Sequence, residues 1–332
     1  MILNTTDIAP ADAALADALM TGDRRALARA ITLVESSRAD HQVRAQQVLA
    51  RVLPAAGRSI RLGFSGAPGV GKSTFIETFG GHVTKLGHRL AVLAIDPSSR
   101  VSGGSILGDK TRMELLARNP AAFIRPTPSG GALGGVARRT REAMILVEAA
   151  GFDVVIVETV GVGQSETTVA DMVDMFVLLL SPGGGDDLQG IKRGIMELAD
   201  LLVVNKADGA LEAPARMAAA DHAAALHLMR PKTPVWTAEV LLASAVTNKG
   251  LAEVWDAVCR YRAALDGAGL IEGRRHIQAR AWMWREIEDG LIERLRADPA
   301  VAGLAPGMEA AVAEGRLTPT AAAFEVLARF RG

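Results

Sequence analysis

A glycine-rich run carries the residue types that bind a chain of phosphates. The run is Gly66-Ala67-Pro68-Gly69-Val70-Gly71-Lys72-Ser73, which fits the pattern G-x-x-x-x-G-K-[ST] of a phosphate-binding loop. Its glycines let backbone N–H groups turn inward around phosphate oxygens. We expect Lys72 to reach the β- and γ-phosphates and the Ser73 hydroxyl to bind Mg²⁺. Thr74, the next residue, is placed in the same site.

The sequence on either side of this run supports the same interpretation. Ile60-Arg-Leu-Gly-Phe64 before it is typical of a buried strand, and Thr74-Phe-Ile-Glu-Thr-Phe after it suits a helix. A helix that begins near Lys72 adds its positive N-terminal end to the phosphate site. The alternative is a glycine-rich turn that binds nothing, and such a turn has no need for a strand, a lysine and a serine in this register.

A second motif, Asn205-Lys206-Ala207-Asp208, ends an apolar run and indicates which base is bound. The Asp208 carboxylate can accept the N1 and N2 hydrogens of guanine, whereas adenine lacks that pair of donors. The Lys206 stem can lie over the base, and Asn205 can connect the base site to the phosphate loop. A further base contact is expected at Ser244-Ala245, where a backbone N–H can meet guanine O6. GTP and GDP are therefore the expected ligands.

Acidic residues between the two motifs are expected to hold or surround the magnesium ion. Asp96 and Glu158 each follow a predicted strand, and Asp109 follows a glycine-rich stretch. Asp96 has an alternative role as a turn former before a proline. The N–H of Gly161 is placed to bond the γ-phosphate and to lose that bond after hydrolysis, as in a switch. We assign catalysis to Lys72, Glu158 and Gly161.

The residue after that glycine is Val162, where many related switches have a glutamine that orients the attacking water. A valine cannot orient water, so we expect slow intrinsic hydrolysis that depends on another group or on a partner. Gln164 is a nearby amide that can substitute, or it is a plain loop residue. No arginine is assigned as a finger. The candidates are Arg112, Arg138 and Arg139, with a structural or solvated role as the alternative for each.

A third loop, Ser181-Pro-Gly-Gly-Gly-Asp-Asp-Leu-Gln-Gly-Ile-Lys192, follows another predicted strand. Three consecutive glycines weaken local order. We interpret this loop as a further switch that carries the nucleotide state to a partner, with Asp186, Asp187 and Lys192 as its charged residues. The alternative is a disordered connection.

Composition limits the classes of partner and the compartment. The 332 residues include 37 Lys plus Arg and 37 Asp plus Glu, so the formal charge is zero and nothing favours nucleic acid or an anionic membrane. The apolar runs are too short for a membrane span, and the N-terminus does not read as a secretory signal. Cys259 is the single cysteine, which indicates a reducing cytoplasm, and we expect it to be a buried apolar residue.

Strand-like and helix-like runs alternate in the middle of the chain, which predicts an α/β fold with a mostly parallel sheet flanked by helices. Ligands of such sheets bind at the carboxyl ends of the strands, where the motifs lie. We expect a helical N-terminal extension (1–57), a P-loop GTPase domain (58–265) and a helical C-terminal extension (266–332). The predicted strands are Ile60–Ser65, Leu90–Ile95, Phe123–Arg125, Val154–Glu158, Met175–Leu180, Leu201–Asn205, Val235–Thr237 and Leu241–Ala243.

The C-terminal extension carries a long apolar stripe that is wider than one helix face. Trp282 and Met283 widen the stripe, which favours a partner surface such as a dimer contact, with packing against its own core as the alternative. The residues of the stripe are Ile277, Ala281, Trp284, Ile287, Leu291 and Leu295.

Taken together, these segments resemble the methylmalonyl-CoA mutase-associated GTPases, whose bacterial members are also described as arginine/ornithine transport-system kinases. The resemblance rests on GAPGVGKST, IDPSS, DKTRM, VETVGVGQSE, SPGGGDDLQGIK and NKAD, and it covers nearly the whole chain.

The resemblance implies a homodimeric, Mg²⁺-dependent GTPase that assists adenosylcobalamin-dependent methylmalonyl-CoA mutase. Such proteins couple GTP to loading of the intact cofactor and to protection or reactivation of the mutase. The resemblance also gives Asp96, Asp109 and Glu158 magnesium or switch roles, and it matches the loop that ends at Lys192 to an extra switch.

Other functions remain open at this point. A metal-insertion GTPase of related fold needs clustered thiolates or imidazoles, and this chain has one cysteine and dispersed histidines. A transport-system kinase would use ATP, which Asp208 disfavours. A nucleotide-locked scaffold without turnover is compatible with Val162.

Overall fold

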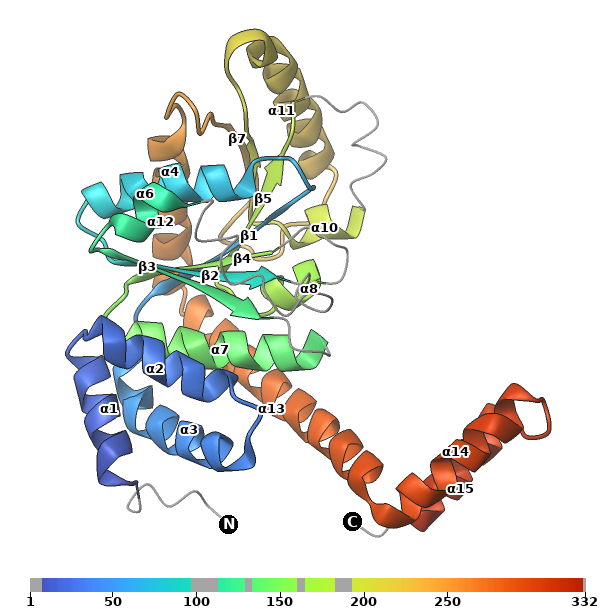
Figure 1. Ribbon diagram of the computed structural model, residues 1–332. Helices are drawn as coiled ribbons and strands as arrows, with labels where there is room; N and C mark the ends of the chain where they lie inside the picture. The colour runs from blue at the N-terminus through green and yellow to red at the C-terminus, as the bar shows by residue number, and fades with distance from the viewer. Residues whose placement is uncertain (1–7, 97–112, 129–132, 160–164, 183–192, 331–332) are drawn as a thin grey trace. The chain divides into compact units, whose positions relative to one another are not determined.

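The computed structural model describes residues 8–96, 113–128, 133–159, 165–182 and 193–330. The chain forms two compact units, Met1–His276 and Ile277–Gly332. In the first unit, seven parallel strands form one sheet in the order β3-β2-β4-β1-β5-β6-β7 (Figure 1). The strands are β1 (Ile60–Gly66), β2 (Leu90–Asp96), β3 (Ala122–Pro128), β4 (Val154–Glu158), β5 (Met175–Leu180), β6 (Leu201–Val204) and β7 (Glu239–Leu242).

Helices precede, cover and follow the sheet. Those of the first unit are α1 (Pro10–Met20), α2 (Arg24–Glu35), α3 (Ala39–Val52), η2 (Leu53–Ala55), α4 (Lys72–Lys85), α6 (Glu114–Arg118), α7 (Leu133–Ala149), α8 (Ser165–Ala170), α10 (Arg193–Leu198), η4 (Gly209–Leu211), α11 (Glu212–His227) and α12 (Leu251–Gly267). The remaining helices are α13 (Leu270–Ala297), which begins in the first unit, α14 (Pro299–Ala313) and α15 (Pro319–Arg329).

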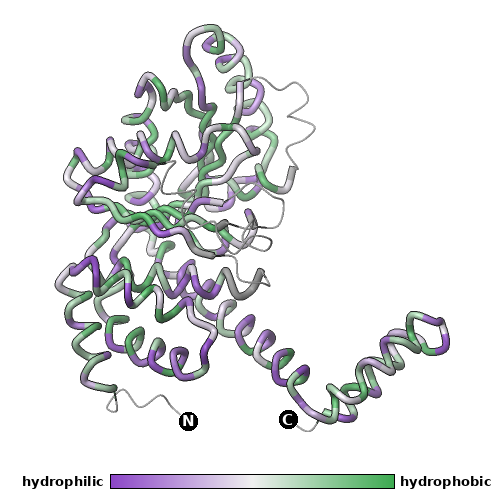
Figure 2. Tube along the Cα trace, viewed as in Figure 1, coloured by the Kyte–Doolittle hydropathy of each residue, from purple (hydrophilic) through white to green (hydrophobic). Residues whose placement is uncertain are grey.

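Both faces of the sheet are covered, which explains why its strands are almost continuously apolar. Helices α4, α6 and α12 lie over one face, and α7 lies over the other (Figure 1). Figure 2 shows the strands as a hydrophobic layer between these helices. The expected α/β fold with a parallel sheet is confirmed.

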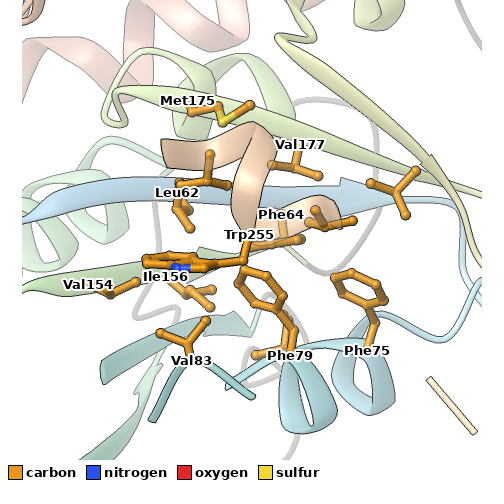
Figure 3. Close-up of a cluster of buried hydrophobic side chains, with 14 of the residues drawn as sticks. Leu62, Phe64, Phe75, Phe79, Val83, Val154, Ile156, Met175, Val177 and Trp255 are labelled. Carbon is orange, nitrogen blue, oxygen red and sulfur yellow. The ribbon is translucent and has the colours of Figure 1, made fainter. Parts of the chain in front are cut away.

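An aromatic cluster fixes α4 against β1, as Figure 3 shows. The ring of Phe64 on β1 lies 5.7 Å from Phe75 and 5.8 Å from Phe79, both on α4. Phe79 in turn packs 6.2 Å from Trp255 of α12. Burying each such side chain contributes about 1.5–3 kcal/mol. Because α4 begins at Lys72, this packing also positions the phosphate loop.

The N-terminal helices α1–α3 form a small bundle against α7. Asp23 caps α2 by accepting hydrogen bonds from the N–H groups of Arg25 and Ala26 at 2.7 and 3.0 Å. The buried Asp12 of α1 pairs with Arg44 of α3, with a shortest distance of 2.8 Å. The helical character expected for this region is observed.

A buried carboxylate ties the last helices of the first unit to the amino ends of the strands. Asp174, fully buried before β5, accepts a hydrogen bond from the Arg61 N–H at 2.9 Å and pairs with Arg275, with Nε–Oδ1 at 2.8 Å. Its carbonyl accepts hydrogen bonds from the Tyr261 hydroxyl at 2.6 Å and from Arg274. Because a buried charge is tolerated only when it is paired, these contacts hold α12 and the start of α13 in place.

Two expectations from the sequence are wrong. The strand expected at Val235–Thr237 is instead a turn with a single bridge between Thr233 and Trp236, because the Trp236 indole turns inward and donates to the carbonyl of Asp200 at 2.8 Å. The edge strand is β7, close to the strand expected at Leu241–Ala243. Cys259 is exposed, because the buried face of α12 carries its larger apolar side chains.

The second unit contains most of α13 together with α14 and α15. Thr318 caps α15 through the Ala321 N–H at 3.3 Å, as expected for a Thr-Pro helix start. Large apolar side chains of α13 remain exposed, including Trp284 (58%) and Leu291 (51%). Among the described helices, none combines the length and apolarity needed to cross a membrane.

Replacing Asp174 with alanine should lower the free energy of unfolding by about 3–5 kcal/mol, because the partly buried Arg275 guanidinium and the buried Arg61 N–H lose their carboxylate partner. Urea denaturation followed by circular dichroism measures this change. The matched control is Asp266→Ala, which removes an exposed pair with Arg262 worth about 0.3–0.5 kcal/mol. Equal losses in the two variants would contradict the role given to Asp174.

Candidate nucleotide site

The phosphate loop leaves β1 at a position that only glycine can occupy. At Gly66 the backbone has φ +153°, and a Cβ atom there would lie 2.4 Å from the carbonyl oxygen of Leu179 on β5. Residues 67–69 form the exposed tip of the loop, and the buried Val70 side chain anchors its return. The loop thus exposes backbone between a fixed strand and a fixed helix, as phosphate binding requires.

Lys72 is 9% exposed, and its ammonium group donates to loop carbonyls, to Gly66 O at 2.8 Å and to Ala67 O at 3.2 Å. Burial lowers the pKa of Lys72, whereas the nearby carboxylates of Glu158 and Glu166 raise it. Bound phosphates would give the ammonium stronger, charge-assisted partners. Thr74 lies exposed in the first turn of the same helix.

The Ser73 hydroxyl donates to Glu158 Oε1 at 2.9 Å, which joins the loop to the end of β4. Glu158 is 7% exposed. Both are oxygen donors of the kind Mg²⁺ prefers, and their separation is close to the roughly 3 Å between adjacent ligands of an octahedral shell with Mg–O distances of about 2.1 Å. This pair therefore fits a magnesium ion.

The base motif contacts the phosphate loop directly. The Asn205 amide donates to Val70 O at 2.9 Å, so this side chain connects the motif to the loop. Lys206 has a left-handed backbone (φ +59°) and donates to Gly69 O at 2.7 Å. The Lys206 side chain therefore reaches from the base motif to the phosphate loop, and its stem can cover a base there.

Asp208 lies beside the second expected base contact. The Ser244 hydroxyl donates to Asp208 Oδ2, and the backbone of residues 243–245 follows β7 at the same edge of the sheet. Ser244 and Ala245 are 0% and 6% exposed, so both residues are packed into the protein. The Ser244 side chain thus contacts the Asp208 carboxylate, whereas the Ser244 N–H donates to the carbonyl of Lys249 at 2.9 Å. The expected backbone contact with guanine O6 therefore falls to Ala245 and stays a prediction.

The remaining predicted site residues differ in whether they belong to the described part of the chain. The backbone of Asp96 lies at the end of β2, beside the end of β4. The predicted residues that lie outside the described part of the chain are Asp109, Gly161, Gln164, Asp186, Asp187 and Lys192. Their metal, catalytic and switch roles stay predictions.

Sequence reasoning missed one residue of this region. Glu166, in the first turn of α8, is 5% exposed, and its Oε2 has no hydrogen-bond partner among the described residues. A glutamate two residues after Gln164 resembles an ordinary acidic helix start, so its burial was not evident. The one feature of the sequence that points to a role for Glu166 is its position in the segment directly after Glu158.

Comparison with known proteins identifies the family. The family model "Methylmalonyl Co-A mutase-associated GTPase MeaB" matches residues 27–300. The chain belongs to the MeaB family. The resemblance found in the sequence is thereby confirmed, and the activity of the family at the general level is that of a GTPase.

Relatives and a solved structure agree with this assignment. A putative GTPase of Caulobacter vibrioides is 59% identical over 312 residues, 94% of this chain and 95% of the relative. The methylmalonic aciduria type A homolog of Mus musculus is 48% identical over 323 residues, 94% of this chain and 78% of the relative. A crystal structure of a LAO/AO transport system kinase has 40% identity and a TM-score of 0.77, and covers 96% of this MeaB-family chain and 97% of its own.

Replacing Asp208 with asparagine should change the base that the site prefers. The carboxylate can accept two hydrogens of guanine, whereas an amide offers one acceptor and one donor, which match the N1–H and C2 carbonyl of xanthine. We expect GDP affinity to fall at least about 100-fold and XDP affinity to rise, as measured by calorimetry.

The control for this change is Asp221→Asn on α11, an exposed carboxylate that should leave both affinities unchanged. Unaltered GDP binding by the Asp208 variant would remove this residue from the base site.

Proposed function

We propose that this protein is a Mg²⁺-dependent GTPase that acts as a chaperone of adenosylcobalamin-dependent methylmalonyl-CoA mutase. GTP binding and hydrolysis would be coupled to loading of the cofactor and to protection or reactivation of the mutase. The observation that carries the proposal is the match of residues 27–300 to a family named for its association with this mutase. The chain's single cysteine supports a cytoplasmic location.

The geometry of the site supports the nucleotide part of the proposal. Lys72 and the loop backbone hold the phosphates, Ser73 and Glu158 hold Mg²⁺, and Asp208 with the 244–245 backbone selects guanine. Mg²⁺ supplies charge neutralisation on the β- and γ-phosphates. Hydrolysis is slow without the partner, because Val162 occupies the position where related switches orient water with a glutamine.

GTP turnover with and without methylmalonyl-CoA mutase tests the chaperone role. We expect the mutase to accelerate phosphate release by at least tenfold, because binding of the partner orders the groups that act on the attacking water. An unrelated enzyme of similar size serves as the control. No acceleration together with no binding would leave a GTPase with a different client.

We also propose a homodimer formed through residues 266–332. The support is the set of exposed apolar side chains on α13 and α15, including Trp284, Leu291 and Phe324 (68% exposed). Light scattering should give twice the chain mass of 34.8 kDa. Leu291→Glu should shift the protein to a monomer, and a monomeric wild type would contradict the proposal.

One other function has support from a comparison. The solved relative carries the name of a LAO/AO transport system kinase. A nucleotide kinase of that kind would bind ADP as well as GDP, and Asp208 disfavours adenine. For the metal-insertion alternative, the described residues contain no group of three or more His, Cys, Asp or Glu side chains suited to a metal ion.

A further inference from the structure

Helix α8 is held unusually close to β1. A Cβ atom at Gly63 would lie 2.8 Å from Val169 Cγ1 and 3.0 Å from Val173 Cγ2, which is closer than side chains pack. The absence of a side chain at Gly63 therefore lets α8 lie directly on the strand. Three residues further along, β1 becomes the phosphate loop at Gly66.

Glu166 and Val169 are three residues apart on α8, so they share one face of the helix. Val169 meets β1 at Gly63, and Glu166 is one turn nearer the start of α8, which follows the carboxyl end of β4. That turn lies toward the carboxyl ends of the strands, where the phosphate loop begins.

Burying a carboxylate oxygen without a hydrogen-bond donor is costly, and more so than for a neutral polar group. Glu166 is 5% exposed, and its Oε2 lacks a donor among the described residues. The Ser73–Glu158 pair already provides the oxygen atoms that fit Mg²⁺. A donor that arrives with the nucleotide would satisfy the remaining oxygen.

We propose that Glu166 is a catalytic residue whose carboxylate accepts a hydrogen bond from the water that attacks the γ-phosphorus of GTP. It fills the place that Val162 leaves without a water-orienting group. The proposal rests on GTP hydrolysis at this site and adds a residue to it. Because Glu166 is carried by α8, a shift of that helix changes the position of the water without moving the phosphate loop.

The step balances as follows. The water oxygen forms a bond to the γ-phosphorus, the bond between that phosphorus and the β–γ bridging oxygen breaks, and its electron pair stays on GDP. The proton of the water passes to the Glu166 carboxylate and then to the departing phosphate. The products are GDP and inorganic phosphate, and the carboxylate returns to its initial state.

The test is Glu166→Gln, which keeps the shape of the side chain and removes the proton acceptor. Single-turnover GTP hydrolysis should fall about 100-fold or more. The affinities for fluorescent GDP and for a non-hydrolysable GTP analogue should stay within threefold of wild type. The Mg²⁺ concentration that half-saturates GDP binding should stay unchanged as well.

Three further variants separate the alternatives. Glu253→Gln removes an exposed carboxylate on α12 and should behave as wild type. Lys72→Ala should weaken binding of the GTP analogue, which Glu166→Gln should not do. Glu166→Asp keeps the charge but withdraws it by one methylene, and should hydrolyse GTP slowly while retaining the wild-type melting temperature.

The possible outcomes are distinct. Normal hydrolysis by Glu166→Gln would overturn the proposal, and so would slow hydrolysis accompanied by a raised Mg²⁺ requirement, because the residue would then serve the metal. A wild-type protein without GTP turnover would refute the proposed GTPase site itself. Slow hydrolysis with unchanged nucleotide and Mg²⁺ binding would support the role of Glu166.

Discussion

The nucleotide site depends on the parallel pairing of β1 between β4 and β5. In this register Phe64 lies opposite Glu158, and Gly66 lies opposite Leu179. The loop that leaves β1 therefore begins beside Glu158 at the end of β4. The hydroxyl of Ser73, in the first turn of α4, donates a hydrogen bond to this carboxylate. A shift of one residue would turn Glu158 to the other face of the sheet. The aromatic cluster between β1 and α4 opposes such a shift.

The two ends of the strands satisfy their polar groups in different ways. At the amino ends, the chain itself neutralises the buried carboxylates, as Arg275 does for Asp174. At the carboxyl ends, Lys72 donates to loop carbonyls and Glu166 keeps an oxygen without a donor among the described residues. Stability is thus concentrated at one edge and ligand dependence at the other, which is the usual arrangement for open parallel sheets.

The phosphate loop, the base motif and most strands were predictable because each depends on local sequence. The prediction of a strand at Val235–Thr237 was wrong because one long-range hydrogen bond, from the Trp236 indole to the carbonyl of Asp200, overrides β-propensity. The prediction that Cys259 is buried was wrong, because the larger apolar residues of α12 occupy the buried face of that helix and leave the cysteine outside. The burial of Glu166 could not be read from the sequence, since it follows from how closely α8 approaches Gly63.

The pairing of Asp174 with Arg275 also has a consequence for biosynthesis. The two residues are separated by 101 positions, and the arginine lies in the last part of the first unit. A nascent chain that has emerged only as far as α11 contains strands β1–β6, but the Asp174 carboxylate at their amino ends still lacks its arginine. We therefore expect the sheet to reach full stability only after the first turns of α13, which carry Arg275, have left the ribosome.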